Sequence, residues 1–152
     1  MKHKLYHGSS KIIKKPTFGV GKRYNDYGLG FYCTESLDMA KEWGVGENHD
    51  GFANCYDFED ESLETLNLMD DSFCILHWLS ILLQNREFEL DSDVAAAAKD
   101  YILAHFPVQT DTVDIICGYR ADDSYFSFAQ NFLNGTLSYA QLNEAMRLGK
   151  LG

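Results

Sequence analysis

Two short segments near the start of the chain combine residue types that can bind and orient a ligand. Residues 5–10 read LYHGSS, and residues 26–36 read DYGLGFYCTES. His7 can hydrogen-bond a hydroxyl group, and Tyr32 offers an aromatic face for stacking. The backbone of Gly8 can be approached closely because this residue has no Cβ. These residue types are compatible with a ligand-binding site near the start of the chain.

Other residues of the two segments fit this interpretation, although each also has a purely structural one. Ser9 and Thr34 can add polar contacts, and Gly28 and Gly30 keep the approach to the second segment open. Alternatively, both glycines supply positive φ angles, the histidine caps a turn, and Tyr32 packs as a core aromatic. Either segment alone favours the structural interpretation, whereas the order and spacing of the two together favour a ligand site.

The elements that must position these residues indicate an α+β fold. Strands are predicted from runs of aromatic, branched or alternating residues, at residues 4–9, 30–34, 52–58, 63–68 and 113–117. Helices are predicted from apolar spacing and capping residues, at residues 36–44, 73–85, 92–106, 121–133 and 138–148. No regular βα repeat is present, which favours a mostly antiparallel or mixed sheet within one domain of residues 1–152.

Charge is distributed unevenly along the chain, whose formal net charge is -10. Residues 1–23 carry seven basic side chains and no acidic one, whereas residues 24–152 hold six basic and all 23 acidic residues, a net charge of -17. Two interpretations stay open for the basic segment. It either complements an acidic body or faces an anion, such as a dinucleotide pyrophosphate or a nucleic-acid backbone. The acidic remainder suggests a basic protein partner.

Composition excludes several classes of protein. No apolar stretch approaches the roughly 18 residues of a membrane span, and the N-terminus lacks the apolar region of a signal peptide. The four cysteines lack metal-ligand spacing, which argues against a zinc site and favours a reducing, cytoplasmic setting; they are Cys33, Cys55, Cys74 and Cys117. The glycine-rich phosphate loops, the HExxH motif and the GxSxG motif do not occur.

The paired segments resemble the first two motifs of the ADP-ribosyltransferase superfamily, in its His-Tyr-Glu branch. In that branch a strand ends in His-Gly-Ser or His-Gly-Thr, and a later strand carries Gly-x-Gly, a hydrophobic residue and Tyr, followed by a helix. His7 and Tyr32 stand at the places of the family histidine and tyrosine. The nearest resemblance is to a small, uncharacterised bacterial family of transferase-like proteins, some linked to toxin–antitoxin systems, and it extends through residues 118–126.

This resemblance implies a split antiparallel or mixed sheet with flanking helices, and NAD as the substrate. His7 and Tyr32 would be catalytic. The residues that would bind NAD are His7, Gly8, Ser9, Gly30, Tyr32 and Thr34. Cleavage of the nicotinamide glycosidic bond develops an oxocarbenium-like ribose, so such a site must hold the ring rigidly and stabilise positive charge. The basic segment would meet the pyrophosphate, and no metal is implied.

The third element of the family, a glutamate on a late strand, has no clear counterpart in this chain. Glu144 lies in a predicted helix, and Glu87 and Glu89 lie in an acidic loop. Three explanations stay open: the chain lacks the last strand, it is a binding-only relative, or Asp122 or Asp123 supplies the carboxylate. The structural alternative for those aspartates is a helix N-cap with surface ion pairing.

The function expected from this resemblance is that of an NAD-dependent mono-ADP-ribosyltransferase-like protein in the cytoplasm. It would act as the toxin of a bacterial toxin–antitoxin or phage-defence system, with an antitoxin protein as a partner and no membrane. The alternative is a catalytically inactive NAD-binding or protein-interaction module on the same fold. A phosphate-transferring, RNA-processing enzyme is disfavoured by the acidic body of the protein.

Overall fold

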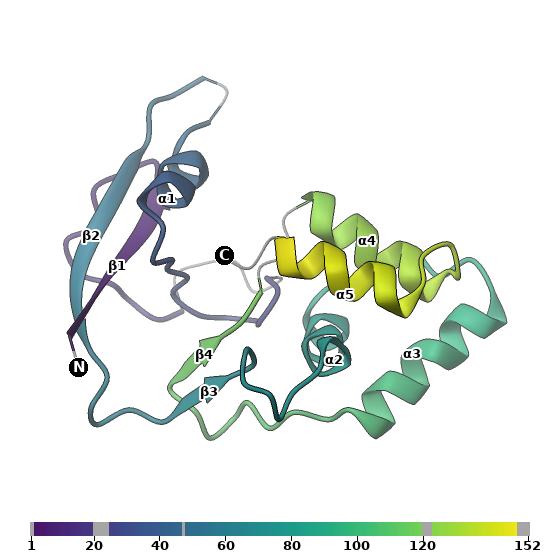
Figure 1. Cartoon of the computed structure of the whole chain (residues 1–152). Coiled ribbons are helices and arrows are strands. Elements are labelled where there is room, and N and C mark those ends of the chain that lie inside the picture. The colour runs from purple at the N-terminus through teal and green to yellow at the C-terminus, as the bar shows by residue number, and fades with distance from the viewer. Residues whose placement is uncertain (1, 20–24, 47, 120–122, 149–152) are drawn as a thin grey trace.

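The computed structural model describes residues 2–19, 25–46, 48–119 and 123–148, and of residues 123–125 and 147–148 it describes the backbone alone (Figure 1). Within this part of the chain the fold is mixed α+β, with five helices and two small sheets. The elements in chain order are β1 (Lys2–Ser9), α1 (Leu37–Gly44), β2 (Phe52–Glu59), β3 (Thr65–Asn67), α2 (Ile75–Asn85), α3 (Asp93–His105), β4 (Ile115–Cys117), α4 (Asp123–Leu133) and α5 (Tyr139–Leu148).

The strands β1 and β2 form an antiparallel pair along their whole length, from Lys2 opposite Glu59 to Ser9 opposite Phe52. Helix α1 packs against both strands. Its first turn is capped by the Ser36 hydroxyl, which accepts a hydrogen bond from the backbone N–H of Met39. Strands β1 and β2 and helix α1 lie together at one side of the molecule (Figure 1).

The second sheet pairs β3 with β4 in parallel, from Thr65 opposite Ile115 to Asn67 opposite Cys117. These short strands lie between the β1–β2 pair and the helices α2 to α5 (Figure 1). A parallel pair needs a long crossover connection, and here α2 and α3 provide it.

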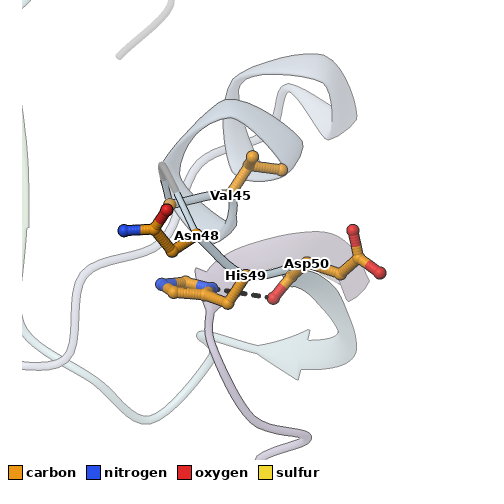
Figure 2. A pocket seen from close by; sticks show the side chains of 5 residues that line it. Val45, Asn48, His49 and Asp50 are labelled. Carbon is orange, nitrogen blue, oxygen red and sulfur yellow. Dashed lines mark hydrogen bonds between the residues drawn. The ribbon is translucent and has the colours of Figure 1, made fainter.

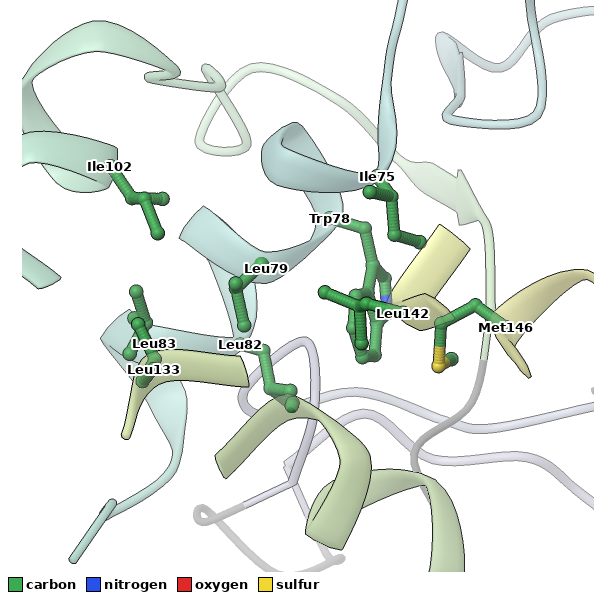
Figure 3. Packing of buried hydrophobic residues seen from close by; sticks show 10 residues of the cluster. Ile75, Trp78, Leu79, Leu82, Leu83, Ile102, Leu133, Leu142 and Met146 are labelled. Atoms are coloured by element: carbon green, nitrogen blue, oxygen red, sulfur yellow. The ribbon is translucent and has the colours of Figure 1, made fainter. Parts of the chain in front are cut away.

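The hydrophobic core lies among the helices and is centred on α2 (Figure 3). Trp78, Leu79 and Leu82 of this helix are at most 1% exposed. They pack in one cluster with side chains of α3, α4 and α5, among them Ile102, Leu133, Leu142 and Met146. Because burial of apolar surface is the main stabilising contribution to folding, this cluster holds α2 in place among the other helices.

The five predicted helices are confirmed, with ends that differ by a few residues. Their ends carry the expected caps: the Ser92 hydroxyl accepts from the N–H of Ala95 at 3.1 Å. Ser138 and Gln141 bond reciprocally at the start of α5, the arrangement of a capping box. No described helix is both long enough and apolar enough to cross a bilayer.

Three strand predictions need correction. Residues 30–34 form no strand, because only Thr34 pairs with β1, through a single bridge to Tyr6. The turn that precedes them contains Gly28, whose φ is +82°. The predicted strand 63–68 is shortened to Thr65–Asn67. The predicted buried strand 113–117 is β4, whose residues are half-buried to exposed because it belongs to a two-stranded sheet.

Candidate functional site

The end of β1 and the segment that carries Tyr32 lie side by side. Tyr6 and Thr34 exchange two backbone hydrogen bonds, at 2.8 and 2.9 Å. One residue further along β1, the Nδ1 atom of His7 lies 2.5 Å from the Tyr32 backbone oxygen. The His7 ring also stacks on Phe31, with ring centroids 4.3 Å apart. The fold therefore joins the two segments on which the sequence analysis depends.

The bond from His7 to the Tyr32 carbonyl determines how the imidazole can act. A carbonyl oxygen can only accept, so Nδ1 must carry a proton. In the neutral imidazole the other ring nitrogen, Nε2, is then a hydrogen-bond acceptor. Stacking on Phe31 holds the plane of the ring, and Phe31 in turn contacts Tyr56 of β2 edge to face, at 5.9 Å between ring centroids.

The Tyr32 side chain is half-buried, and its hydroxyl bonds within the same segment. It donates to the Gly28 oxygen at 2.5 Å and accepts from the N–H of Tyr27 at 3.1 Å. The structural interpretation of Gly28 is confirmed, because its positive φ is one that glycine adopts most readily. A Cβ at this position would also lie 2.9 Å from the side-chain oxygen of Asn85. Tyr32 is thus held by a turn that requires glycine.

Gly8 and Gly30 have different surroundings. A Cβ on Gly8 would collide with the backbone oxygen of Ala40, so its lack of a side chain lets α1 approach β1. Gly30 adopts no positive φ, and its nearest neighbour for a Cβ is the Tyr32 ring at 3.8 Å. The space in which a Gly8 side chain would lie is therefore filled by helix α1. A ligand could contact Gly8 only on the side that faces away from this helix.

The hydroxyls of Ser9 and Thr34 both bond within the protein. Ser9 donates to the Lys11 oxygen at 2.5 Å. Thr34 is 2% exposed, and its hydroxyl accepts from the N–H of Ser36 at 3.0 Å. These bonds shape the turns that follow β1 and precede α1, and contact of either hydroxyl with NAD stays a prediction.

Asn54 of β2, which the sequence analysis did not single out, connects several parts of the site. Its side chain is 8% exposed. The amide nitrogen donates to the His7 oxygen at 3.0 Å and to the Ser9 hydroxyl at 2.8 Å, and the amide oxygen accepts from the N–H of Ile13 at 2.8 Å. The only sign of this role in the sequence was a polar amide among alternating strand residues. Local sequence does not identify its partners, because they lie 41 to 47 residues away in the chain.

A second missed feature anchors the tyrosine segment to the helices. Asp26 is 1% exposed and forms an ion pair with Arg86, at 2.8 Å between carboxylate oxygen and guanidinium nitrogen. The Arg86 guanidinium also lies over the Phe126 ring, 4.3 Å from its centroid. Asn85 donates to the Asp26 backbone oxygen at 3.3 Å. The position of Tyr32 consequently depends on the C-terminal end of α2.

The segment that follows β4 also reaches the tyrosine segment. The Tyr119 backbone oxygen accepts from the Tyr27 hydroxyl and from the Trp78 indole nitrogen, the latter at 3.1 Å. A Cβ on Gly118 would collide with that Tyr27 hydroxyl. The end of β4 is therefore held next to the turn that carries Tyr32.

The candidate carboxylates are placed only in part. Asp122 lies outside the described residues, and Asp123 begins α4 with its side chain outside them. A further carboxylate, that of Glu35, is exposed and directly follows Thr34, which pairs with β1. Burial raises the pKa of the Cys117 thiol, and the negative charges of Glu35 and Asp60 raise it further.

The basic segment divides into paired and unpaired side chains. Lys2 and Lys4 of β1 form exposed ion pairs with Glu59 and Asp57 of β2, at 3.1 and 3.3 Å. The remaining described lysines of the segment are exposed and form no ion pair with the described residues; they are Lys11, Lys14 and Lys15. Lys22 and Arg23 lie outside the described residues. Acidic residues of β2 thus pair with the lysines of β1, whereas the lysines of the loop after β1 keep their positive charge.

A surface hollow lies at the turn after α1, lined by Val45, Gly46, Asn48, His49 and Asp50 (Figure 2). The His49 side chain bonds the Asp50 backbone oxygen there, at 2.8 Å (Figure 2). None of the site residues expected from the sequence lines this hollow. In the described part of the chain, no three His, Cys, Asp or Glu side chains gather as a metal site would require.

Comparison with known proteins assigns the chain to a family without a known activity. The model of DUF3990, described as a protein of unknown function, matches residues 3–152, and the chain belongs to this family. Neither the curated proteins nor the solved structures contain a match.

The Asp26–Arg86 pair gives a prediction for stability. Replacement of Asp26 by Ala leaves the partly buried Arg86 without its carboxylate, and we expect unfolding to become easier by about 3 kcal/mol, as for other broken buried pairs. Urea denaturation followed by far-UV circular dichroism measures this loss. The matched control is Asp57→Ala, which breaks an exposed pair and should leave the midpoint nearly unchanged. Equal losses in both variants would contradict the anchoring role of Asp26.

The surroundings of Cys33, next to Tyr32, give a second prediction. Burial raises the pKa of the Cys33 thiol to about 11, so at pH 8 about one thiol in a thousand is ionised. Because the thiolate is the reactive form, and because the pKa of the other exposed thiol, Cys117, is raised, a disulfide reagent should react first with the exposed Cys55. Cys55→Ser should remove the fast phase of labelling, whereas Cys33→Ser should leave it unchanged. A fast phase lost in Cys33→Ser would show that this thiol is open to solvent.

Proposed function

We propose that this DUF3990 protein is an NAD-dependent mono-ADP-ribosyltransferase-like protein with the split sheet of that superfamily. It would act as the toxin of a bacterial toxin–antitoxin or phage-defence system, in the cytoplasm. The observation that carries the proposal is the contact of His7 with the Tyr32 backbone, at 2.5 Å. It brings together the two motifs that resemble the family, although 25 residues separate them in the chain.

His7 and Tyr32 have properties suited to holding NAD. With Nδ1 bonded to the Tyr32 oxygen, the Nε2 atom of the neutral His7 ring can accept a hydrogen bond from a ribose hydroxyl. The Tyr32 ring is tethered through its hydroxyl and would stack against the nicotinamide. A ring held at both its backbone and its hydroxyl loses little freedom when a ligand binds, which favours rigid orientation of the reacting bond.

A carboxylate near the ribose would stabilise the positive charge that develops as nicotinamide leaves. The bonds to the Tyr119 oxygen support Asp122 or Asp123 in this role, because they hold the chain beside the tyrosine segment three to four residues before those aspartates. Glu35 is a further candidate, since it directly follows Thr34, whose backbone bonds Tyr6 of β1 next to His7.

The second candidate function is a catalytically inactive NAD-binding or protein-interaction module on the same fold. The observation that favours it is the position of the last three glutamates of the chain. Glu87 and Glu89 lie in the loop after α2, and Glu144 lies on α5, so none of the three stands on a strand. Such a protein would bind NAD, or a partner such as an antitoxin, and release no nicotinamide.

Calorimetric titration with NAD tests the binding site. We expect Tyr32→Ala to weaken NAD binding roughly tenfold, because an aromatic stack contributes about 1 kcal/mol beyond the area that it buries. Tyr32→Phe keeps the ring and should bind more tightly than Tyr32→Ala. Tyr101→Ala is the control, since this tyrosine is 57% exposed on α3 and should not affect binding. Absence of binding to the unaltered protein would remove NAD from the proposal.

Release of nicotinamide tests the carboxylate. We expect one of the variants Asp122→Asn and Asp123→Asn to lose nicotinamide release while its affinity for NAD stays unchanged, because the carboxylate acts on the developing charge. Glu35→Gln tests the other candidate, and loss of release in this variant alone would assign the carboxylate to Glu35. Unchanged release in both aspartate variants would exclude their role. Binding without release in the unaltered protein would favour the inactive module.

A further inference from the structure

The loop after β1 carries a concentration of positive charge that the protein itself does not neutralise. Lys11, Lys14 and Lys15 lie within five residues, are exposed, and form no ion pair within the described part of the chain. In contrast, the two lysines of β1 pair with acidic residues of β2. Within the described residues, the loop therefore gathers three lysines without an ion pair in one short segment.

The backbone of this loop is anchored, which fixes where its side chains project. The N–H of Ile13 donates to the Asn54 side chain at 2.8 Å, and the Ile13 oxygen accepts from the Tyr56 hydroxyl at 2.6 Å. Ser9 bonds the Lys11 oxygen at 2.5 Å, and Pro16 restricts the chain further. A loop that is already ordered loses little conformational entropy when a ligand binds.

Two large apolar side chains are interleaved with the lysines and project into solvent. Ile12 is 65% exposed and Phe18 is 74% exposed, the largest exposed fraction of any described aromatic residue. Neither contributes to the core. An exposed aromatic ring beside several lysines is the combination with which proteins bind single-stranded nucleic acid, because bases stack on the ring and phosphates meet the cations.

We propose that residues 11–18, called here the basic loop, bind single-stranded nucleic acid. The proposal goes beyond NAD chemistry and does not rest on it. A pyrophosphate would use the lysines but has no need of the exposed Ile12 and Phe18, whereas a nucleic-acid strand uses both kinds of side chain. The anchor Asn54 also bonds the His7 backbone oxygen, and the anchor Tyr56 contacts the Phe31 ring, so a bound strand would pass near the His7–Phe31 stack.

The charge of the remaining protein determines which polyanion fits. Residues 24–152 carry a net charge of -17, and charges repel one another over a Debye length of about 8 Å at physiological salt. A planar anionic membrane or a duplex would approach this acidic surface as well as the loop. A single strand is narrow and flexible enough to contact the loop alone. The loop also lacks the amphipathic helix with which many proteins bind at a membrane surface.

Fluorescence anisotropy with a fluorescein-labelled oligothymidylate tests the proposal over a range of salt concentrations. We expect the triple variant Lys11→Gln/Lys14→Gln/Lys15→Gln to bind more weakly and to reduce the slope of log affinity against log salt by about 2, at roughly 0.7 for each phosphate contact. Phe18→Ala should weaken binding roughly fivefold to a hundredfold, because one stacked base is lost. The matched control is Lys2→Gln/Lys4→Gln/Lys99→Gln, which removes the same charge elsewhere and should keep the salt slope of the unaltered protein.

Several outcomes would overturn the proposal. These are no binding of the oligonucleotide at low salt, an equal loss in the control, or tighter binding to a duplex of the same length. Sedimentation with phosphatidylserine vesicles that depends on Phe18, without oligonucleotide binding, would assign the loop to a membrane instead. Displacement of the oligonucleotide by saturating NAD would assign the lysines to the pyrophosphate. Failure of NAD to bind leaves the anisotropy test unaffected, so the two proposals fail separately.

Discussion

The carboxylate of Asp26 is 1% exposed and lies 2.8 Å from the guanidinium of Arg86, directly after the last residue of α2. Because a buried charge must be paired, this contact ties the segment that carries Tyr32 to the helix at the centre of the core. The same segment bonds β1 through Thr34. The geometry at His7 is therefore linked to the packing of α2 through this segment.

Many polar groups of the site form hydrogen bonds within the protein and so hold the site in its conformation. The hydroxyls of Tyr32, Ser9 and Thr34 all bond to backbone groups of the protein. The fold has the advantage that each turn is held in one conformation, and a ligand meets a preorganised surface. The groups that this surface presents to a ligand are chiefly the Nε2 atom of His7, the ring of Tyr32 and the lysines of the basic loop.

Asn54 connects the proposed NAD site and the basic loop. Its amide bonds the His7 oxygen on one side and the N–H of Ile13 on the other. A buried amide with satisfied donors and acceptors is rigid, so the distance between the two surfaces is set by one side chain of β2. A dinucleotide and a nucleic-acid strand would then bind at neighbouring parts of the protein, joined by Asn54.

Local chemistry determined much of this protein from its sequence. Helix starts at Ser36, Ser92 and Ser138 depend on bonds across three residues, and the sequence therefore predicts them. The resemblance of the histidine and tyrosine motifs to a known family implied a shared site, and His7 does lie against the Tyr32 backbone. Residues 30–34 have the composition of a strand, but their pairing depended on whether a neighbouring strand was available.

Only the tertiary structure decided that β1 pairs with β2, that β3 pairs with β4, and that Asp26 meets an arginine 60 residues away. Such contacts bring together residues far apart in the chain, and neither periodicity nor local propensity encodes them.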